Sequence, residues 1–389
     1  MSDPGPGLSR QAGLYMKGLR GEREATPLDF SALEAAAQAR LTPEAFAYIA
    51  GGAGREATAE ANRAALDQWR ITPRMARDCS RRDLTVTLFG KTMPTPLLTA
   101  PVGVLSMAHP EADLAVARAA SNLGMPMIIS NQASYPMEQI ADCCAGAPKW
   151  FQLYWGKSDA LVASLVRRAE VCGCDAIVVT LDTTVLGWRV RDLALGHLPF
   201  LKGQGIAQYI SDPVFRSMLG ETPEKNPLAA AVMFTQIYSD PSLTWEKLKT
   251  LRKLTRLPIL VKGIQHPEDA ALAVEHGFDG IVVSNHGGRQ VDGAVGSADQ
   301  LVLCAERVDG KIPVLFDSGV RSGADAFKAL ALGADAVCIG RPYAYGLAVG
   351  GQAGVEAVLS NLVAELDITL ALSGWTSASQ LNRDALSSL

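Results

Sequence analysis

The chain has 389 residues, of which 48% are hydrophobic and 20% are charged, so it can bury a large core. Its formal net charge of −4 gives no electrostatic reason to expect binding to nucleic acid or to an anionic membrane. The N-terminus lacks the apolar core of a signal peptide, and no apolar stretch is long enough to cross a bilayer, so we expect a cytoplasmic protein.

Seven cysteines are scattered through the chain, an odd count that does not suggest a disulfide framework. Cys143-Cys144 and Cys172-Gly173-Cys174 lie close in sequence, but no histidine or further cysteine pair follows at a ligand spacing. We therefore expect no metal site, and interpret the cysteines as reduced thiols of a cytosolic protein.

The first 95 residues precede any regular alternation of elements. Residues 1–27 begin with a Gly- and Pro-rich segment and are expected to be a flexible tail, followed by one domain over 28–389. An alanine-rich stretch at Ser31–Arg40 and the segment Pro43–Ala50 predict two helices, and Leu84–Leu88 predicts a β element. This part is expected to form an N-terminal helical extension.

From about residue 96 onward, short apolar runs alternate with helical patterns such as Glu111–Leu123, Asp159–Val171, Pro267–His276 and Gly323–Leu332. The eight runs are Leu97–Val102, Met125–Ser130, Trp150–Leu153, Ala176–Leu181, Pro258–Lys262, Gly280–Ser284, Pro313–Asp317 and Ala336–Gly340. Eight βα units predict an α/β fold, a (β/α)8 TIM barrel with a parallel sheet. A doubly wound open sheet is the competing topology.

An insertion at about 183–242 separates the fourth predicted strand from the next helix. A segment of this length inside a compact domain is usually functional, and it leaves the strand at the end where barrel active sites lie. We interpret it as a lid, with a surface excursion or a subunit contact as the alternative.

The segment Ser284–Gln290 follows the sixth predicted strand and places His286 three residues before Arg289. A proton acceptor and a forked cation at the carboxyl end of a buried strand indicate an active site, and the intervening glycines permit a sharp turn. The alternative for His286 is a core histidine with satisfied hydrogen bonds.

The last two βα units carry Asp317–Gly323 and Ile339–Pro342, each with a glycine close to an arginine. Loops seven and eight are the usual phosphate site of this architecture, and Arg321 and Arg341 would supply donors beside a helix N-terminus. Alternatively, both arginines pair with carboxylates at the barrel rim.

Four other strand ends each contribute one polar side chain: Ser130, Gln152, Thr180 and Lys262. Burying Lys262 is costly unless it meets an anion or an electron-rich ring, so it either forms a Schiff base or stabilises a reduced flavin. The convergence of these groups with a phosphate site favours a mononucleotide lying across the barrel mouth.

Together these segments resemble the motifs of the FMN-dependent α-hydroxy acid oxidase and dehydrogenase family. The matching motifs are Tyr48–Ala53, Phe151–Tyr154, Thr180–Thr183, Lys262-Gly263, Ser284–Gln290, Asp317–Arg321 and Gly340–Pro342. The resemblance runs from about Leu28 to the C-terminus. Within the family, Leu186–Leu193, Pro199–Leu201, Ser211–Phe215, Lys262–Pro267 and Leu315–Gly319 are most similar to lactate 2-monooxygenases.

The resemblance implies an FMN enzyme that oxidises a small (S)-2-hydroxy acid, with hydride passing from Cα to flavin N5. It implies that His286 is the base and Asp182 its partner, that Tyr154 lies near the reacting oxygen, and that Lys262 stabilises the reduced flavin. Arg189, Arg289 and Tyr48 would hold the substrate carboxylate. The residues expected to hold FMN are Pro101, Val102, Gly103, Ser130, Gln152, Thr180, Lys262, Ser284, Asp317, Gly319, Arg321, Gly340 and Arg341.

The resemblance leaves the second half-reaction open. O2 is the expected acceptor, and L-lactate giving acetate and CO2 is the expected reaction. Gly103 does not decide the acceptor, because dehydrogenases of the family also carry glycine at the matching position. Gln132 and Ser106 occupy the region that lines the substrate side chain in the family, and both are polar, which allows a substrate other than lactate. A homo-oligomer, tetramer or octamer, is expected. A non-redox isomerase or aldolase that uses Lys262, and a non-catalytic flavin-binding protein, are the competing classes.

Overall fold

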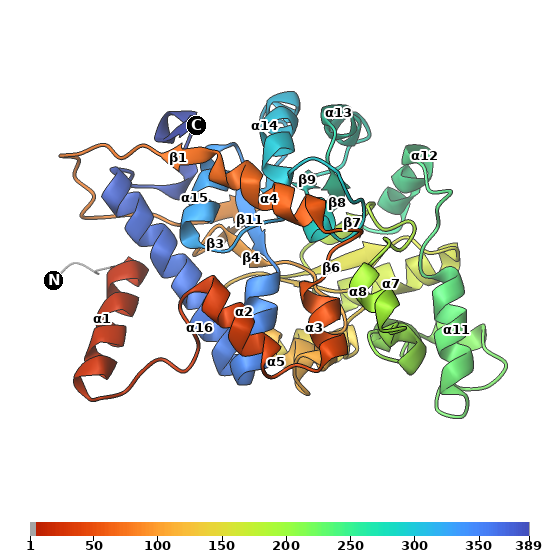
Figure 1. Ribbon diagram of the computed structural model, residues 1–389. Coiled ribbons are helices and arrows are strands. Elements are labelled where there is room, and N and C mark those ends of the chain that lie inside the picture. Colours follow the sequence, from red (N-terminus) through yellow and green to blue (C-terminus); the bar gives the residue numbers. More distant parts are fainter. Residues whose placement is uncertain (1–4, 389) are drawn as a thin grey trace.

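The computed structural model describes residues 5–388, and eight parallel strands in it close into a barrel (Figure 1). The strands are β4 (Leu97–Thr99), β5 (Met127–Ile129), β6 (Lys149–Tyr154), β7 (Ile177–Thr180), β8 (Ile259–Ile264), β9 (Gly280–Val283), β10 (Val314–Phe316) and β11 (Ala336–Ile339). Each predicted apolar run overlaps one strand, and β11 pairs with β4 to close the ring. The TIM barrel prediction is therefore confirmed, and the open doubly wound sheet is wrong.

Helices follow the strands in turn and form the outer layer of the barrel. They are α5 (Ala112–Asn122), α6 (Met137–Cys143), α7 (Asp159–Val171), α12 (Trp245–Leu248), α13 (Pro267–Glu275), α14 (Ser297–Val308), α15 (Gly323–Ala331) and α16 (Arg341–Ser373). Side-chain caps fix several starts: Ser158 accepts a hydrogen bond from Leu161 N at α7, and Ser322 accepts one from Asp325 N at α15. The four helical patterns predicted from sequence match α5, α7, α13 and α15 to within two residues.

The inside of the barrel holds its own small apolar core, made of side chains such as Leu98, Trp150, Leu260 and Leu315. A hairpin of β2 (Val86–Leu88) and β3 (Lys91–Met93) packs Leu88 and Met93 against this core. The hairpin therefore covers the barrel end opposite the carboxyl ends of the strands, where the pocket described below opens.

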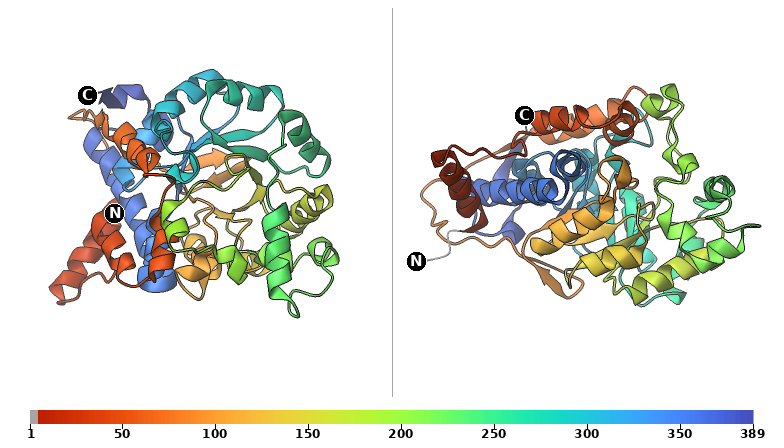
Figure 2. Two further views of the ribbon diagram at one scale, coloured as in Figure 1. Left: turned by 45° about the vertical axis from the view of Figure 1, so that its right-hand side comes forward. Right: turned by 90° about the horizontal axis from the view of Figure 1, so that it is seen from below.

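Within the expected flexible tail over 1–27, residues 5–19 form the helix α1 (Gly5–Leu19), and residues 1–4 lie outside the described residues. The helix packs beside α16 and projects from the body in Figures 1 and 2. Gly7 N donates to Asp367 Oδ2 over 2.9 Å, and a Cβ at Gly7 would lie 2.7 Å from both Asp367 Oδ2 and Ile368 Cγ1. The glycine that suggested flexibility instead permits close helix packing.

The remaining N-terminal elements are α2 (Phe30–Gln38), α3 (Pro43–Ala50), α4 (Ala57–Asp67) and β1 (Trp69–Ile71). Strand β1 pairs antiparallel with β12 (Leu386–Ser388), which joins the segment before the barrel to the C-terminal segment. The predicted helices Ser31–Arg40 and Pro43–Ala50 correspond to α2 and α3.

The insertion between β7 and α12 folds into short helices rather than a loop. They are α8 (Val190–Ala194), α9 (Ala207–Ile210), α10 (Pro213–Ser217), α11 (Pro227–Ile237) and the 3-10 turn η2 (Pro199–Lys202). Phe200, Tyr209, Phe215, Phe234 and Tyr238 form a buried aromatic cluster with ring centroids 4.7–6.3 Å apart. The insertion thus has a core of its own. No helix within residues 5–388 is long and apolar enough to span a membrane.

Candidate active site

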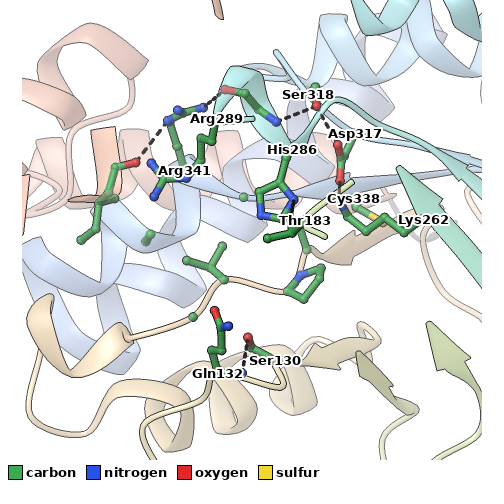
Figure 3. A pocket seen from close by; sticks show the side chains of 18 of the residues that line it. Ser130, Gln132, Thr183, Lys262, His286, Arg289, Asp317, Ser318, Cys338 and Arg341 are labelled. Carbon is green, nitrogen blue, oxygen red and sulfur yellow. Dashed lines mark hydrogen bonds and ion pairs between the residues drawn. The ribbon is translucent and has the colours of Figure 1, made fainter. Parts of the chain in front are cut away.

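A cavity of about 1020 Å³, including its open mouth, lies at the carboxyl end of the barrel (Figure 3). Most of the residues selected from sequence line it: Tyr48, Pro101, Val102, Gly103, Ser130, Tyr154, Arg189, Lys262, His286, Arg289, Asp317, Gly319, Arg321, Gly340 and Arg341. Four others, Asp182, Gln152, Thr180 and Ser284, do not line the cavity but contact residues that do or extend their hydrogen-bond network.

His286 and Asp182 form a buried pair at the centre of the site. His286 Nδ1 lies 2.8 Å from Asp182 Oδ1 and 3.3 Å from Thr183 Oγ1. Burial lowers the pKa of His286, and the carboxylate offsets this only in part. Burial would raise the pKa of Asp182, but His286 and Lys262 outweigh it and lower the pKa to about 2. The resting pair is a carboxylate beside a neutral imidazole that donates from Nδ1, so Nε2 is available as a proton acceptor.

The backbone at His286 is held in the left-handed region, with φ of +60° at His286, +66° at Gly287 and +77° at Gly288. A Cβ on Gly287 would lie 2.7 Å from Arg341 Nη1, and one on Gly288 would lie 2.6 Å from Ala59 N. Only glycine can follow the histidine in this turn, which explains the His-Gly-Gly sequence. A non-glycine residue in this conformation is strained, and the surrounding hydrogen bonds hold it there.

Arg189 and Arg289 concentrate positive charge on one side of the cavity. The Tyr48 ring lies 6.0 Å and 5.1 Å from their guanidinium carbons. Arg289 donates to Gly51 O over 2.6 Å, and neither arginine forms an ion pair with a carboxylate within residues 5–388. Burial and the charge of Arg189 lower the pKa of Arg289 to about 9. Two largely enclosed cations that form no ion pair among residues 5–388 are suited to binding a carboxylate from the ligand.

Lys262 is buried and donates to Ser284 Oγ over 2.7 Å, with Asp317 Oδ2 at 3.1 Å. Burial would lower the pKa of this amine, but the carboxylates of Asp317 and Asp182 outweigh burial and raise it. A Schiff-base nucleophile must be neutral, so this environment argues against the aldolase alternative and for a fixed positive charge.

Polar side chains line up along the neighbouring strand ends. Ser130 Oγ donates to Gln152 Oε1 over 3.1 Å, and Gln152 Nε2 donates to Thr180 Oγ1 over 3.0 Å. Facing them is Gly103, where a Cβ would lie 3.0 Å from Gln132 Cβ and 3.1 Å from Gln132 O. The result is a row of donors and acceptors beside a backbone without side-chain bulk, which fits the edge and face of a flavin ring.

The far end of the cavity holds Arg321, which lies just before α15, and Arg341, which begins α16. Arg341 donates to the carbonyls of Ile49, Gly51 and Gly287 over 2.9–3.2 Å. The guanidinium carbon of Arg321 lies 4.4 Å from the centre of the Phe30 ring.

Neither arginine pairs with a rim carboxylate within residues 5–388, so that alternative is wrong. Burial and the charges of Arg341 and Arg63 lower the pKa of Arg321 to about 10. Arg321 and the helix terminus fit a phosphate, with Arg341 adding charge through a position fixed by carbonyls.

Some lining residues were not found from sequence: Thr183, Leu186, Phe200, Tyr238, Ser318 and Cys338. Thr183 and Ser318 directly follow predicted residues, so strand-end position was a usable signal. Gln132 and Ser106 were both expected to line the region around the substrate side chain. Gln132 lines the cavity, and Ser106 does not. Ser106 N instead donates to Ser134 Oγ over 2.9 Å.

A (β/α)8 barrel whose mouth combines a histidine–aspartate pair, an anion clamp, a buried lysine and a phosphate end defines a flavin-dependent oxidoreductase of hydroxy acids. The profile of the FMN-dependent dehydrogenase family matches residues 37–388, and the chain belongs to that family. It is an FMN-dependent 2-hydroxy acid oxidoreductase.

Individual relatives differ in their substrates. An L-lactate oxidase of Lysinibacillus sphaericus is 47% identical, over 90% of both chains. A 4-hydroxymandelate oxidase of Amycolatopsis orientalis is 40% identical, over 92% of this chain and 98% of the relative. The crystal structure of mandelate oxidase with (S)-4-hydroxymandelic acid superposes with a TM-score of 0.83 at 40% identity, covering 93% of this chain and 99% of the other. Similarity thus establishes the reaction class and leaves the substrate open.

Proposed function

We propose that this enzyme oxidises a small (S)-2-hydroxy acid of about the size of L-lactate, with O2 as electron acceptor. The observation that carries the proposal is the neutral imidazole of His286, held by the Asp182 carboxylate and facing a cavity that also holds two arginines without an ion-pair partner among residues 5–388. A base and a carboxylate clamp in one small cavity are what Cα oxidation of a hydroxy acid needs.

In the proposed mechanism, Arg189, Arg289 and Tyr48 bind the substrate carboxylate and direct its hydroxyl toward His286 Nε2. The hydroxyl proton passes to Nε2, and Asp182 stabilises the imidazolium that forms. Tyr154, whose pKa burial raises to about 12, stays protonated and donates a hydrogen bond near the reacting oxygen. Loss of this proton and of a hydride from Cα leaves the 2-keto acid.

FMN supplies the hydride acceptor in this reaction. Residues proposed to hold it are Pro101, Val102, Gly103, Ser130, Gln152, Thr180, Lys262, Ser284, Asp317, Gly319, Arg321, Gly340 and Arg341. The positive charge of Lys262 is fixed by Asp317 and is suited to stabilise negative charge at the ring edge.

For the second half-reaction we propose a monooxygenase outcome, in which the keto acid stays bound and the sum is lactate plus O2 giving acetate, CO2 and water. Arg189, which would grip the product, comes from the insertion, and Leu186, Phe200 and Tyr238 of the same insertion line the cavity. These contacts support a lid that delays product release. The similarity to an L-lactate oxidase favours the alternative, release of pyruvate and H2O2. Aerobic turnover of (S)-lactate with product analysis separates the two, and turnover only with an added acceptor indicates a dehydrogenase.

We also propose a cytoplasmic homo-oligomer, a tetramer or an octamer. All seven cysteines are free thiols, which supports a reducing compartment. Large apolar side chains remain exposed at Val185, Trp188 and Leu193 of the insertion, and at Tyr15 and Leu19 of α1, which supports burial against further copies. Light scattering on the purified holoenzyme measures the assembly.

The role of His286 is tested by His286→Ala. Because the variant lacks the proposed proton acceptor, we expect the rate of anaerobic flavin reduction to fall at least about 1000-fold, while FMN stays bound. Stopped-flow absorbance measures the reduction, and the flavin spectrum measures FMN content. His276→Ala serves as a control, since His276 lies at the end of α13 against Trp245. Reduction of the His286→Ala enzyme at a near-native rate contradicts the proposed base.

A further inference from the structure

Gln132 occupies a fixed position where the loop after β5 meets the insertion. Its N–H donates to Ser130 Oγ over 3.1 Å, and its carbonyl accepts from Val104 N over 2.9 Å. The next residue, Ala133, accepts from Ala207 N of the insertion over 3.4 Å. The backbone is therefore held from two sides, which restricts where the side chain can point.

The side-chain amide of Gln132, in contrast, has no hydrogen-bond partner among residues 5–388. The residue is only 8% exposed and lines the cavity, and in Figure 3 its amide points into the space toward which His286 also projects. The amide faces the open cavity, where water can reach it. A ligand that displaces this water without hydrogen-bonding to the amide leaves it unpaired, which costs about 1–3 kcal/mol. A nonpolar ligand at this point would displace water without replacing its hydrogen bonds.

The surroundings of the amide narrow the chemistry of that group. A Cβ on Gly205 would lie 3.1 Å from the backbone oxygen of Gln132 and 3.3 Å from Phe200 Cε1. The loop that carries Gln132 and the Phe200 ring of the insertion are therefore neighbours. The Lys and Arg side chains that line the cavity are Arg189, Lys262, Arg289, Arg321 and Arg341. Because all five are assigned to the carboxylate clamp, the flavin edge and the phosphate end, none remains to balance a second substrate carboxylate. A neutral hydroxyl, which can both donate to and accept from an amide, satisfies Gln132 best.

We propose that Gln132 selects 2-hydroxy acids that carry a further hydroxyl on a short side chain, such as L-glycerate, over L-lactate. This inference rests on the proposed function, because it takes the clamp and His286 to orient the acid so that its side chain extends toward Gln132. The two acids share the configuration at Cα and the reacting atoms, and differ by one hydroxyl on the side chain. Their comparison therefore isolates the contact with the amide.

The experiment measures anaerobic flavin reduction of the holoenzyme by L-glycerate and by (S)-lactate, for the wild type, Gln132→Leu and Ser106→Ala. Ser106 is the matched control, since it lies in the neighbouring loop and does not line the cavity. For the wild type we expect the second-order rate constant for L-glycerate to exceed that for (S)-lactate at least about tenfold. Gln132→Leu should abolish this preference, mainly by slowing L-glycerate, and Ser106→Ala should keep it. Titration of the oxidised enzyme with hydroxypyruvate and pyruvate should show the same change in binding.

Equal rates for the two acids in the wild type overturn the inference. A loss in Gln132→Leu that is equal for both acids also overturns it, because Gln132 would then act on the flavin or on the shape of the cavity. Both outcomes leave the proposed function standing, since the flavin is still reduced. A flavin that no 2-hydroxy acid reduces is a different result, in which the proposed function itself fails.

Discussion

The environment of each charged side chain decides the chemistry of this site. The same burial that lowers the pKa of His286 is outweighed at Lys262 by two carboxylates, so one group is a neutral base and the other a permanent cation. The Asp182 carboxylate acts on both groups: it raises the pKa of Lys262, and it opposes the effect of burial on the pKa of His286. Its second oxygen has no protein partner among residues 5–388. It is therefore the residue whose removal should disturb the site most specifically.

Asp182→Asn should slow flavin reduction about 100- to 10,000-fold, because the imidazolium formed at His286 loses its counter-charge. The carboxylate raises the pKa of His286, so its removal should lower that pKa further. At pH values below the His286 pKa the base is protonated and the reduction rate decreases. This acid limb of the pH profile should therefore move to lower pH in the variant. The pH profile of the reduction rate checks both points. An acid limb that moves to higher pH contradicts the assigned pair.

The charged residues of the site could be predicted from the sequence, but the shape of the cavity could not. His286, Arg289, Lys262 and Asp317 follow predicted strands, and strand ends in a barrel converge whatever the details of packing. Gln132 and Ser106 were equivalent candidates in sequence. The structure separates them, because Gln132 lines the cavity, whereas Ser106 does not and donates through its N–H to Ser134 Oγ.

At the scale of elements, the barrel strands could be predicted because buried parallel strands require continuous apolar runs. The helices of the insertion could not be predicted, since α8, α9 and α10 have only four or five residues and show no usable periodicity. Its aromatic cluster depends on contacts between residues 200 and 238, and no local pattern encodes these. Phe200 and Tyr238 were missed for this reason.

Gln290 joins the start of the insertion to the catalytic loop. Its Nε2 donates to Asp182 O over 2.7 Å and to Val185 O over 3.0 Å, and its Oε1 accepts from Arg189 Nη2 over 3.2 Å. Gln290→Ala removes these bonds and the one from Gly187 N, so Arg189 keeps only its bond to Arg289 O of 3.4 Å. We expect the dissociation constant of the substrate to rise about 10- to 100-fold, with a smaller change in the maximal reduction rate.

The matched control is Arg191→Ala, which removes a link between the insertion and the N-terminal segment. The Arg191–Glu56 pair, 2.6 Å apart, is partly exposed and should contribute little, so its loss should change substrate binding less than about threefold. Substrate titrations of the reduction rate provide both values. Equal effects of the two substitutions would show that the insertion as a whole, and not Gln290, positions Arg189.

At the scale of the whole molecule, the composition of the N-terminal segment gave the wrong expectation, because long-range packing determines its structure. The Gly- and Pro-rich N-terminal segment suggested disorder, yet Gly7 fits α1 against Asp367, which also accepts from Arg82 Nε over 2.6 Å. A buried carboxylate 360 positions away in the chain cannot be inferred from the local sequence. The barrel itself was predictable because it arises from eight repeated local units.

The stability of the whole molecule should depend on pH through Asp113, a fully buried residue of α5. Its Oδ2 accepts from Ser134 N over 2.8 Å, while Oδ1 has no partner among residues 5–388. Burial raises its pKa to about 7, whereas an unfolded aspartate titrates near 3.9. Between about pH 4 and 7 the folded state keeps a proton that the unfolded state has lost, so the contribution of Asp113 to stability falls as pH rises.

Asp113→Asn should remove this contribution, which has a slope of at most about 1.4 kcal/mol per pH unit, and keep the bond from Ser134 N. The variant should therefore gain stability relative to the wild type as pH rises from 5 to 7, and the difference should level off above pH 7. Urea unfolding at several pH values measures the free energy of unfolding for both proteins. Asp159→Asn, at the exposed first turn of α7, controls for loss of a carboxylate at a helix start. Parallel curves for the wild type and Asp113→Asn would show that Asp113 stays ionised in the folded protein, which means that an unseen partner compensates its burial.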